Sequence, residues 1–309
     1  MKNYLIIIAL FCLTSACESQ DILSYTGYSR AGIGYDICID NDLVYVTNNE
    51  GVVIFNIDEP KQPRKVSKIE AGVTFGVCVS GGLAYIASGT NLIIADVTDP
   101  SNPEILLEFP LKDETHGIRV DGSIVYVCSH RGLIILDAGN PKDVSEIAHY
   151  GDQDMREIEI RDGIAYIACP QVGVEVIDVR NLLAPVKIAT LPDTERAWDV
   201  HIHENQLYVG CHASGIAIFR ISENKIPEKL GVFRDDDGGE ATGVWGNGKL
   251  LFVEDNSHLE ILDISDPANP IEIAENKRGE GHSLCIKGNY VYIASYRKGL
   301  LVFQYSKNK

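Results

Sequence analysis

The feature that most constrains this chain is a unit of about 40 residues that recurs seven times. Each unit holds a strand-like run with one large aromatic residue at a fixed place, as in LVYVTNNEGVVIFNIDEP (43–60). The seven aromatics are Tyr45, Tyr85, Tyr126, Tyr166, Tyr208, Phe252 and Tyr292, at intervals of 40, 41, 40, 42, 44 and 40 residues. This period matches a four-stranded propeller blade, so the repeat predicts an all-β, seven-bladed β-propeller.

Each unit divides into four strands separated by turn residues. Before the marker aromatic comes an alternating run such as YDICID, followed by a tight turn rich in Gly, Asn and Asp. After the marker strand come a short polar loop and a strand such as VVIFNI, which ends at a Pro-containing corner in most units. A more polar strand such as RKVSKIE completes the unit and suits the outer edge of a blade.

The two ends of the chain predict how the ring closes. The seventh unit stops after GLLVFQYS and lacks a fourth strand, whereas residues 21–31 resemble the fourth strands and precede the first unit. We therefore expect the N-terminal strand to complete the last blade, so that 21–309 form a single closed domain. The period-2 alternation and the Pro corners exclude helical repeats, and an open solenoid is the main alternative.

The first residues are expected to direct export rather than to join the fold. MKNYLIIIALFCLTSAC has a basic start, an apolar run and then small residues, and the run is too short to span a bilayer as a helix. Residues 13–17 (LTSAC) resemble the lipobox of bacterial lipoproteins. That resemblance implies a signal peptide over 1–16, a lipidated Cys17 and a short tether over 17–20. An ordinary signal peptide cut near Ala16 is the alternative.

Charge and the anchor together limit where the protein acts. The formal net charge is −17, which repels phosphate backbones and anionic headgroups, so we expect no nucleic-acid partner and membrane contact only through the lipid. Glu18 follows the cysteine in place of the Asp that retains some lipoproteins at the inner membrane. We therefore expect a cell-envelope lipoprotein at the outer membrane, facing either the periplasm or the cell surface.

The repeat itself resembles a known family. GLIILDAGNP, GVEVIDVRN and LEILDISDPANP, each preceded by a strand such as AYIA or VYV, resemble the LVIVD repeat over residues 34 to 305. The resemblance implies a bacterial or archaeal β-propeller, often exported and lipid-anchored, and it implies no reaction. The fourth and fifth units depart from it only at the corner, with RNLLAP and SENKIP in place of the usual DP turn.

Six cysteines remain in the expected mature domain, and they occupy equivalent places in the repeat. They are Cys38, Cys78, Cys128, Cys169, Cys211 and Cys285. Small side chains packed between sheets explain this regularity, because a free cysteine behaves as a small hydrophobic residue. Disulfides, which an exported protein can form, and metal ligation are the alternatives.

Positions that vary between units, while the strands do not, predict where function lies. The first set lies just before the innermost strands and consists of Tyr35, Phe75, His116, Arg156, Trp198, Thr242 and His282. The second set lies in the loops between the second and third strands, at residues 47–50, 88–90, 129–131, 169–172, 211–214, 254–258 and 295–298. In propellers both sets face the mouth of the central channel. The candidate ligand-binding residues are Tyr35, Phe75, His116, His130, Arg131, Arg156, Glu157, Trp198, Asp199, His212, His282, Tyr296 and Arg297. Their mixture of aromatic and charged side chains suits recognition of a ligand.

Three more specific chemistries are conceivable for the histidines and acids of these loops and turns. The histidines 116, 130, 212 and 282 could gather a metal, but no HxH or HExxH spacing supports this, and we expect neither metal nor cofactor. Asp199 with His201, or Asp255 with His258, could form an acid–base pair, although no nucleophile is evident. Turn acids such as Asp40 and Asp42 lack the spacing of a known calcium loop.

These observations favour a binding module over an enzyme, without assigning catalytic residues. We expect a lipid-anchored propeller that binds a protein, peptide or glycan at the channel mouth. The alternative is a hydrolase or lyase at the same place. An enzyme should gather titratable groups with shifted pKa values in one pocket, whereas a binding module should present a broad aromatic and polar surface.

Overall fold

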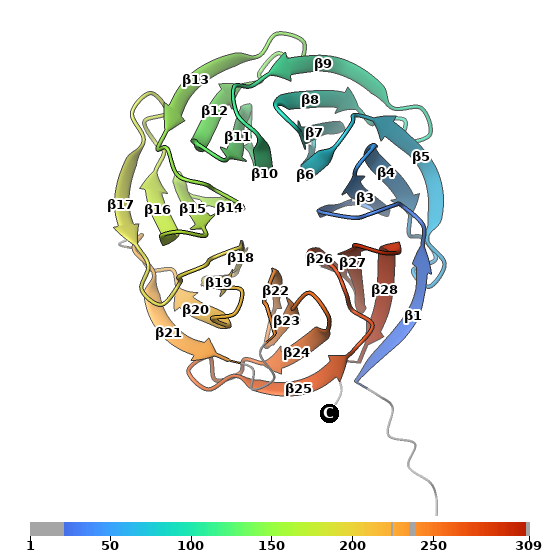
Figure 1. Cartoon of the computed structure of the whole chain (residues 1–309), viewed down its shortest axis with the longest axis vertical. Coiled ribbons are helices and arrows are strands. Elements are labelled where there is room, and N and C mark those ends of the chain that lie inside the picture. Colours follow the sequence, from blue (N-terminus) through green and yellow to red (C-terminus); the bar gives the residue numbers. More distant parts are fainter. Residues whose placement is uncertain (1–21, 224, 235–238, 307–309) are drawn as a thin grey trace, which may run out of the picture.

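Every strand of the protein belongs to one of seven radially arranged sheets (Figure 1). The computed structural model describes residues 22–223, 225–234 and 239–306, and within these ranges the chain has strands and no helix. Each sheet has four antiparallel strands. The prediction of an all-β, seven-bladed propeller is therefore confirmed. The expected signal peptide, lipidated Cys17 and tether all lie outside the described residues.

The strands form four concentric layers around the central axis. The innermost strands are β2 (Ile37–Asp40), β6 (Thr74–Ser80), β10 (Thr115–Asp121), β14 (Ile158–Arg161), β18 (Asp199–His203), β22 (Gly243–Asn247) and β26 (Ser283–Lys287). The second strands are β3 (Leu43–Asn48), β7 (Leu83–Ser88), β11 (Ile124–Ser129), β15 (Ile164–Cys169), β19 (Gln206–Gly210), β23 (Leu250–Glu254) and β27 (Tyr290–Ser295). The third strands are β4 (Gly51–Asn56), β8 (Asn91–Asp96), β12 (Gly132–Asp137), β16 (Gly173–Asp178), β20 (Ile216–Arg220), β24 (Leu259–Asp263) and β28 (Gly299–Tyr305). The outer strands are β5 (Arg64–Glu70), β9 (Glu104–Pro110), β13 (Ser145–Tyr150), β17 (Val186–Thr190), β21 (Glu228–Phe233), β25 (Ile271–Asn276) and β1 (Leu23–Ser29).

The ring closes as the sequence predicts. Strand β1, from the start of the described chain, pairs antiparallel with β28 and becomes the outer strand of the last blade (Figure 1). Thr26 Oγ1 donates a hydrogen bond to the carbonyl oxygen of Val302 at 2.9 Å, and the rings of Tyr25 and Phe303 lie 5.5 Å apart. This seam leaves no blade one strand short, so it removes an unpaired edge that could join other chains.

The hydrophobic core lies between neighbouring blades rather than at the centre of the ring. Each of the seven apolar clusters joins two adjacent sheets, and the last and first blades share one of them. The seven marker aromatics are all buried in these clusters. This packing holds the blades together and leaves the residues nearest the axis free to line a channel.

Two local features repeat around the ring. In all seven blades the outer strand meets the third strand with a one-residue irregularity, as at Ile54/Phe55 and Ile94/Ala95. Such bulges increase strand twist. In several blades the Asn or Asp that ends the third strand accepts a backbone N–H two residues later, as Asp96 does from Thr98 at 2.9 Å. These Asx turns shape the Pro-containing corners.

The six cysteines within the described residues are free thiols. Cys128, Cys169, Cys211 and Cys285 are buried, and Cys38 and Cys78 are partly buried beside the channel. This arrangement matches the interpretation of small packing residues, and no disulfide joins them within the described part of the chain. The described part of the chain contains no helix of the length and apolarity needed to cross a membrane.

Candidate functional site

The segments that lead into the innermost strands build a cavity at one end of the channel. Equivalent backbone hydrogen bonds hold them, such as Trp198 N–H to Gly210 O at 2.8 Å and His282 N–H to Ala294 O at 3.0 Å. The cavity has a volume of about 280 Å³. All seven residues of the first predicted set line it, namely Tyr35, Phe75, His116, Arg156, Trp198, Thr242 and His282. The structure thus brings together residues that lie up to 247 positions apart in the sequence.

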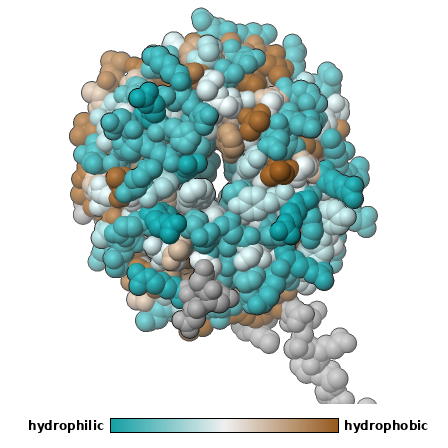
Figure 2. Space-filling model, in the orientation of Figure 1, coloured by the Kyte–Doolittle hydropathy of each residue, from teal (hydrophilic) through white to brown (hydrophobic). Residues whose placement is uncertain are grey.

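The centre of the disc is open to solvent. Figure 2 shows a narrow opening there, surrounded mainly by hydrophilic residues and residues of intermediate hydropathy. On the face in view, the opening is therefore bordered mainly by polar rather than apolar residues.

Aromatic rings form an arc along the wall of the cavity. The rings of Tyr35 and Phe75 lie 5.3 Å apart, those of Tyr35 and His282 5.9 Å apart, and those of Phe75 and His116 5.9 Å apart. Tyr296 extends the arc, because its hydroxyl lies 2.8 Å from Nδ1 of His282. These spacings are in the range in which aromatic rings attract one another, so the wall is a pre-formed apolar surface.

Arg156 completes the wall on the opposite side. Its guanidinium carbon lies 4.9 Å from the centroid of the Trp198 ring, within the range of a cation–π contact. The same guanidinium binds Oδ2 of Asp154 through Nε at 3.0 Å and through a terminal nitrogen at 2.8 Å. The charge of Arg156 is therefore already matched by a carboxylate outside the cavity.

Three carboxylates form the floor of the cavity. Asp36, Glu157 and Asp199 each come one residue after a member of the first set, where other blades have Gly or Ser. Asp199 Oδ2 accepts the Val244 N–H at 2.7 Å, and Asp36 accepts the Val77 N–H at 3.0 Å and the Ser283 hydroxyl at 2.9 Å. These bonds to neighbouring blades fix the direction of the carboxylates.

Burial changes the acidity of this floor. It raises the pKa of Glu157 to about 8 and that of Asp199 to about 7, and it also raises the pKa of Asp36. Mutual repulsion among the three groups acts in the same direction. Burial also lowers the pKa of His282 to about 4, so this imidazole is neutral at pH 7. The floor is a site where added positive charge would be stabilised.

A further polar layer lies deeper in the channel, and the sequence analysis had named only His201 among its residues. Arg119 lies 3.3 Å from Glu157 and 3.5 Å from Glu159, and Glu159 lies 3.6 Å from Nδ1 of His201. These residues come three positions after the first set, in the register of Cys38 and Cys78. Because alternate residues of a strand share one face, counting onward by two from the floor would have found them.

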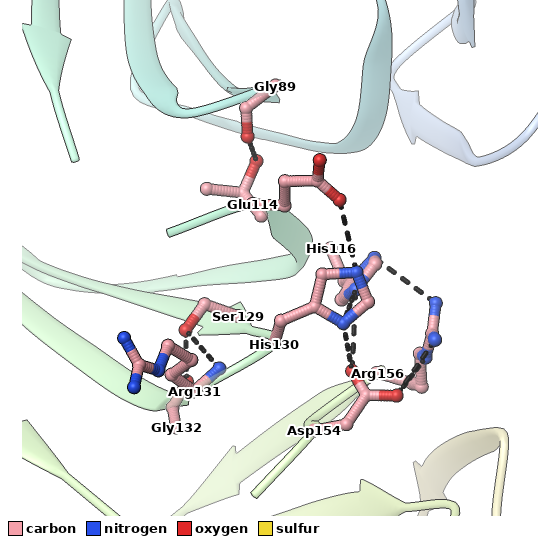
Figure 3. Close-up of polar contacts among 10 residues, drawn as sticks. Gly89, Glu114, His116, Ser129, His130, Arg131, Gly132, Asp154 and Arg156 are labelled. Carbon is pink, nitrogen blue, oxygen red and sulfur yellow. Dashed lines mark hydrogen bonds and ion pairs between the residues drawn. The ribbon is translucent and has the colours of Figure 1, made fainter. Parts of the chain in front are cut away.

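Some residues of the second predicted set contact residues of the first set, and others do not. The ring of His130 lies 4.5 Å from that of His116, and the ring of His212 lies 5.7 Å from that of Trp198. Arg131 is exposed, and its side chain points away from His116 and His130 (Figure 3). The side chain of Arg297 is 79% exposed and lies 3.7 Å from Glu280.

Some loop positions expected at the rim are instead structural. Thr47, Asn48 and Glu254 are buried. Asn48 donates to the carbonyl oxygen of Ala31, and Glu254 accepts the Gly281 N–H at 2.7 Å and the Thr242 hydroxyl at 2.5 Å. These expectations were wrong because the second strands continue further than the polar sequence suggests, and their last residues hold the loops together.

The proposed acid–base pairs are only partly assembled. Asp199 lies on the cavity floor, whereas His201 lies deeper and stacks on Trp245 at 4.2 Å. Asp255 and His258 are 3.5 Å apart, but Asp255 Oδ1 accepts the backbone N–H groups of Ser257 and His258. Of the turn acids, Asp42 pairs with Lys287 at 2.7 Å. The hydroxyl of Ser257 donates to the same Asp255 Oδ1 at 3.3 Å.

A cluster at the edge of the cavity includes two carboxylates that the sequence analysis did not select. Asp154 lies 3.0 Å from Nδ1 of His130 and 3.5 Å from Nε2 of His116, and Glu114 lies 3.1 Å from Nε2 of His130 (Figure 3). Both carboxylates come two residues before a member of the first set, as Glu240 and Glu280 do. That shared register is the signal that would have identified them.

Comparison with known proteins supports the fold and the repeat. Two solved structures each match 92% of this chain over 100% of their own length. One is the computationally designed Ika8 protein, at 9% identity and a TM-score of 0.66, and the other is the Cps50 (Swd1) β-propeller domain of Myceliophteria thermophila, at 13% identity and a TM-score of 0.72. Such identities show the fold alone. No curated protein matches the sequence.

The family comparison agrees with the resemblance noted in the sequence. The model of the LVIVD repeat matches residues 71–109, 114–152, 238–275 and 278–303. These matches fall on the second, third, sixth and seventh blades of the ring. The chain therefore contains LVIVD repeats and has the fold of a seven-bladed β-propeller.

Proposed function

We propose that this protein is a lipid-anchored binding module of the cell envelope that takes a cationic side chain of a protein or peptide partner into the channel-mouth cavity. The observation that carries the proposal is the composition of that cavity. Three carboxylates form its floor beneath a wall of aromatic rings. The propeller is a fold that presents one face to partners, and the anchor follows from the lipobox-like LTSAC at 13–17.

A cationic group fits this site for electrostatic reasons. Asp36, Glu157 and Asp199 are desolvated and repel one another, which raises their pKa values. An ammonium or guanidinium group that reaches the floor would stabilise their ionised forms. Arg119 offsets only part of this negative charge, because its guanidinium also pairs with Glu159.

The aromatic wall suits the rest of such a side chain. A Lys or Arg side chain is an apolar stem with a charged head. The rings of Tyr35 and Phe75 can cover the stem and attract the cation through their faces. The contact between Arg156 and Trp198 is an example of that interaction within the same cavity. A glycan would use the aromatic wall but would leave the carboxylate charges unmatched.

Calorimetry with defined peptides tests this proposal. The probes are blocked pentapeptides Gly-Gly-X-Gly-Gly in which X is Lys, Arg or the neutral norleucine. We expect the cationic peptides to bind the full chain at least about tenfold more tightly than the norleucine peptide. Asp199→Asn and Trp198→Ala should each weaken that binding, whereas Glu104→Gln, on the exposed outer strand β9, should not. Equal binding of the Lys and norleucine peptides would refute the proposal.

The shifted carboxylates also favour one other function, a hydrolase or lyase. Glu157 and Asp199 have pKa values near neutrality, as general acids and bases often do. The polar partners of Asp36 and Asp199 are mainly backbone N–H groups of their own or neighbouring blades, which suits fixed electrostatic recognition better. Turnover of a bound peptide that is lost in Glu157→Gln would favour the enzyme instead.

A further inference from the structure

A second cluster of polar side chains lies at the edge of the cavity, between the third and fourth blades. Its geometry does not depend on the proposed function. Nε2 of His116, Nδ1 of His130 and Oδ1 of Asp154 converge there, from the segment before β10, the loop after β11 and the segment before β14 (Figure 3). The three atoms are 3.5, 3.5 and 3.0 Å apart. Two imidazoles and one carboxylate are ligands that zinc and similar transition metals prefer.

We propose that His116, His130 and Asp154 bind a divalent transition metal of the zinc class. Zinc bonds to nitrogen and oxygen of about 2.0–2.1 Å in a tetrahedron place neighbouring ligand atoms about 3.3–3.4 Å apart. The three separations in this cluster average that value, so a single ion can contact all three atoms with small adjustments. The assignment departs from the sequence-based expectation of no metal, which rested on the absence of a local spacing motif.

The surrounding groups orient the ligands as they do in metal sites. Glu114 Oε2 lies 3.1 Å from Nε2 of His130, on the side of the ring opposite the cluster. Arg156 holds Oδ2 of Asp154 and leaves Oδ1 directed at the histidines. A carboxylate on the distal nitrogen of a ligating histidine fixes its tautomer and its ring orientation. His130 is therefore positioned to offer Nδ1 to a cation.

Without a metal, Nε2 of His116 lies 3.5 Å from Oδ1 of Asp154, and Nδ1 of the same ring faces the guanidinium of Arg156 at 3.5 Å. Ligands must be deprotonated to bind a metal, so zinc would take the place of the proton between Nε2 and the carboxylate.

Three protein ligands leave a coordination position open. His116 lines the cavity, and the side chain of His130 is 42% exposed, so a metal in the cluster would stand at the cavity edge within reach of water. Sites with three ligands and one open position are typical of metals that interact with a substrate or an additional ligand. Arg156 also lies 3.5 Å from Nδ1 of His116. Because a metal on Nε2 places the proton on Nδ1, metal binding should move this guanidinium away from that atom.

Metal titration of the full-length protein, after removal of bound ions with a chelator, tests the proposal. We expect about one equivalent of Zn²⁺ per chain by competition with a chromophoric chelator, and a visible absorption spectrum of tetrahedral Co²⁺. Mg²⁺ and Ca²⁺ should not compete, because they prefer sets of oxygen ligands. Glu114→Gln should weaken zinc binding about 10–100-fold by releasing His130.

Ligand and control variants make the result decisive. His130→Ala and Asp154→Asn should abolish the Co²⁺ spectrum, whereas His149→Ala, at an exposed position of β13, should leave it unchanged. His130 is exposed, so its variant should keep the unfolding temperature of the parent and separate loss of metal from loss of fold. Zinc binding that persists in both ligand variants, or no binding by the parent protein, would overturn the assignment.

Discussion

The guanidinium of Arg119 lies 3.3 Å from the carboxylate of Glu157, directly below the cavity floor. Glu159 lies 3.5 Å from the same guanidinium, so one cation contacts two acidic side chains inside the channel. The structure places this pair where the third and fourth blades meet, at β10 and β14. The stability of the channel should therefore depend on it.

Replacement of Arg119 by Met should destabilise the fold. The change leaves Glu159 without the cation that holds its pKa below the ordinary value, and breaking a buried pair from one side costs about 3–5 kcal/mol. The side chain of Arg119 is 29% exposed, so we expect about 2–3 kcal/mol in urea unfolding. The matched control is Arg64→Met, whose ion pair with Asp58 is solvent-exposed and should contribute much less to stability. Equal losses in the two variants would contradict this role.

Glu157→Gln should change how stability depends on pH. Burial raises the pKa of Glu157 to about 8 from its ordinary value of 4.5. The folded state therefore keeps a proton that the unfolded chain releases between these two values, and its contribution to stability falls as pH rises through that window. Gln carries no charge at any pH. Relative to the parent, the variant should gain roughly 4 kcal/mol between pH 5 and pH 9, because each pKa unit corresponds to about 1.4 kcal/mol.

Denaturant unfolding at several pH values measures that gain. The curves of parent and variant should diverge above pH 5 and meet at lower pH, where the glutamate is protonated in both states. Glu104→Gln, at an exposed position of β9, serves as the control. Parallel curves over the whole range would show that Glu157 does not titrate between pH 5 and 9.

Binding of the cationic peptides should strengthen as pH rises. Asp199, with a pKa of about 7, and Glu157, with one of about 8, hold protons in the empty cavity at pH 6. A cation must displace these protons, so we expect affinity at pH 6 to be at least about tenfold weaker than at pH 9. Lys in the peptide stays charged over this range. Titration calorimetry of the Lys peptide checks this, and pH-independent affinity would exclude carboxylate contact.

The fold could be predicted from the repeat, because the same strand pattern occurs seven times in the sequence. Buried markers such as Tyr45 and Tyr292, and the pairing of β1 with β28, follow from it. The bulge at the edge of each blade does not, because hydrophobic alternation carries no information about a single extra residue.

The site was predictable only where the repeat sets the direction of a side chain. The first set precedes the innermost strands at one register position, and all of it lines the cavity. The second set lies in loops of different length, in which neighbouring residues diverge, as His130 and Arg131 do. His212 has a φ of 46°, a left-handed conformation that no pattern of polar residues predicts. Contacts between blades, such as that of Asp154 with His116, depend on these loops.

Three buried tyrosines provide a last test, because their hydroxyl groups differ in hydrogen bonding although their burial is similar. The hydroxyls of Tyr45 and Tyr292 are buried and have no hydrogen-bond partner in the part of the chain that the structure describes. Tyr305, on the closing seam, donates to the carbonyl oxygen of Gly288 at 3.0 Å and accepts from Asn247 at 2.9 Å. An unpaired buried hydroxyl costs free energy, whereas a bonded one contributes about 1 kcal/mol.

Tyr45→Phe and Tyr292→Phe should therefore leave the free energy of unfolding unchanged or raise it. Tyr305→Phe should lower the free energy of unfolding by about 1 kcal/mol or more, because it also leaves Asn247 without this acceptor. The three substitutions remove the same atom from buried rings, so any difference reports hydrogen bonding rather than packing. Losses of similar size in all three, measured by urea unfolding at one pH, would mean that Tyr45 and Tyr292 also bind a partner, such as an ordered water molecule.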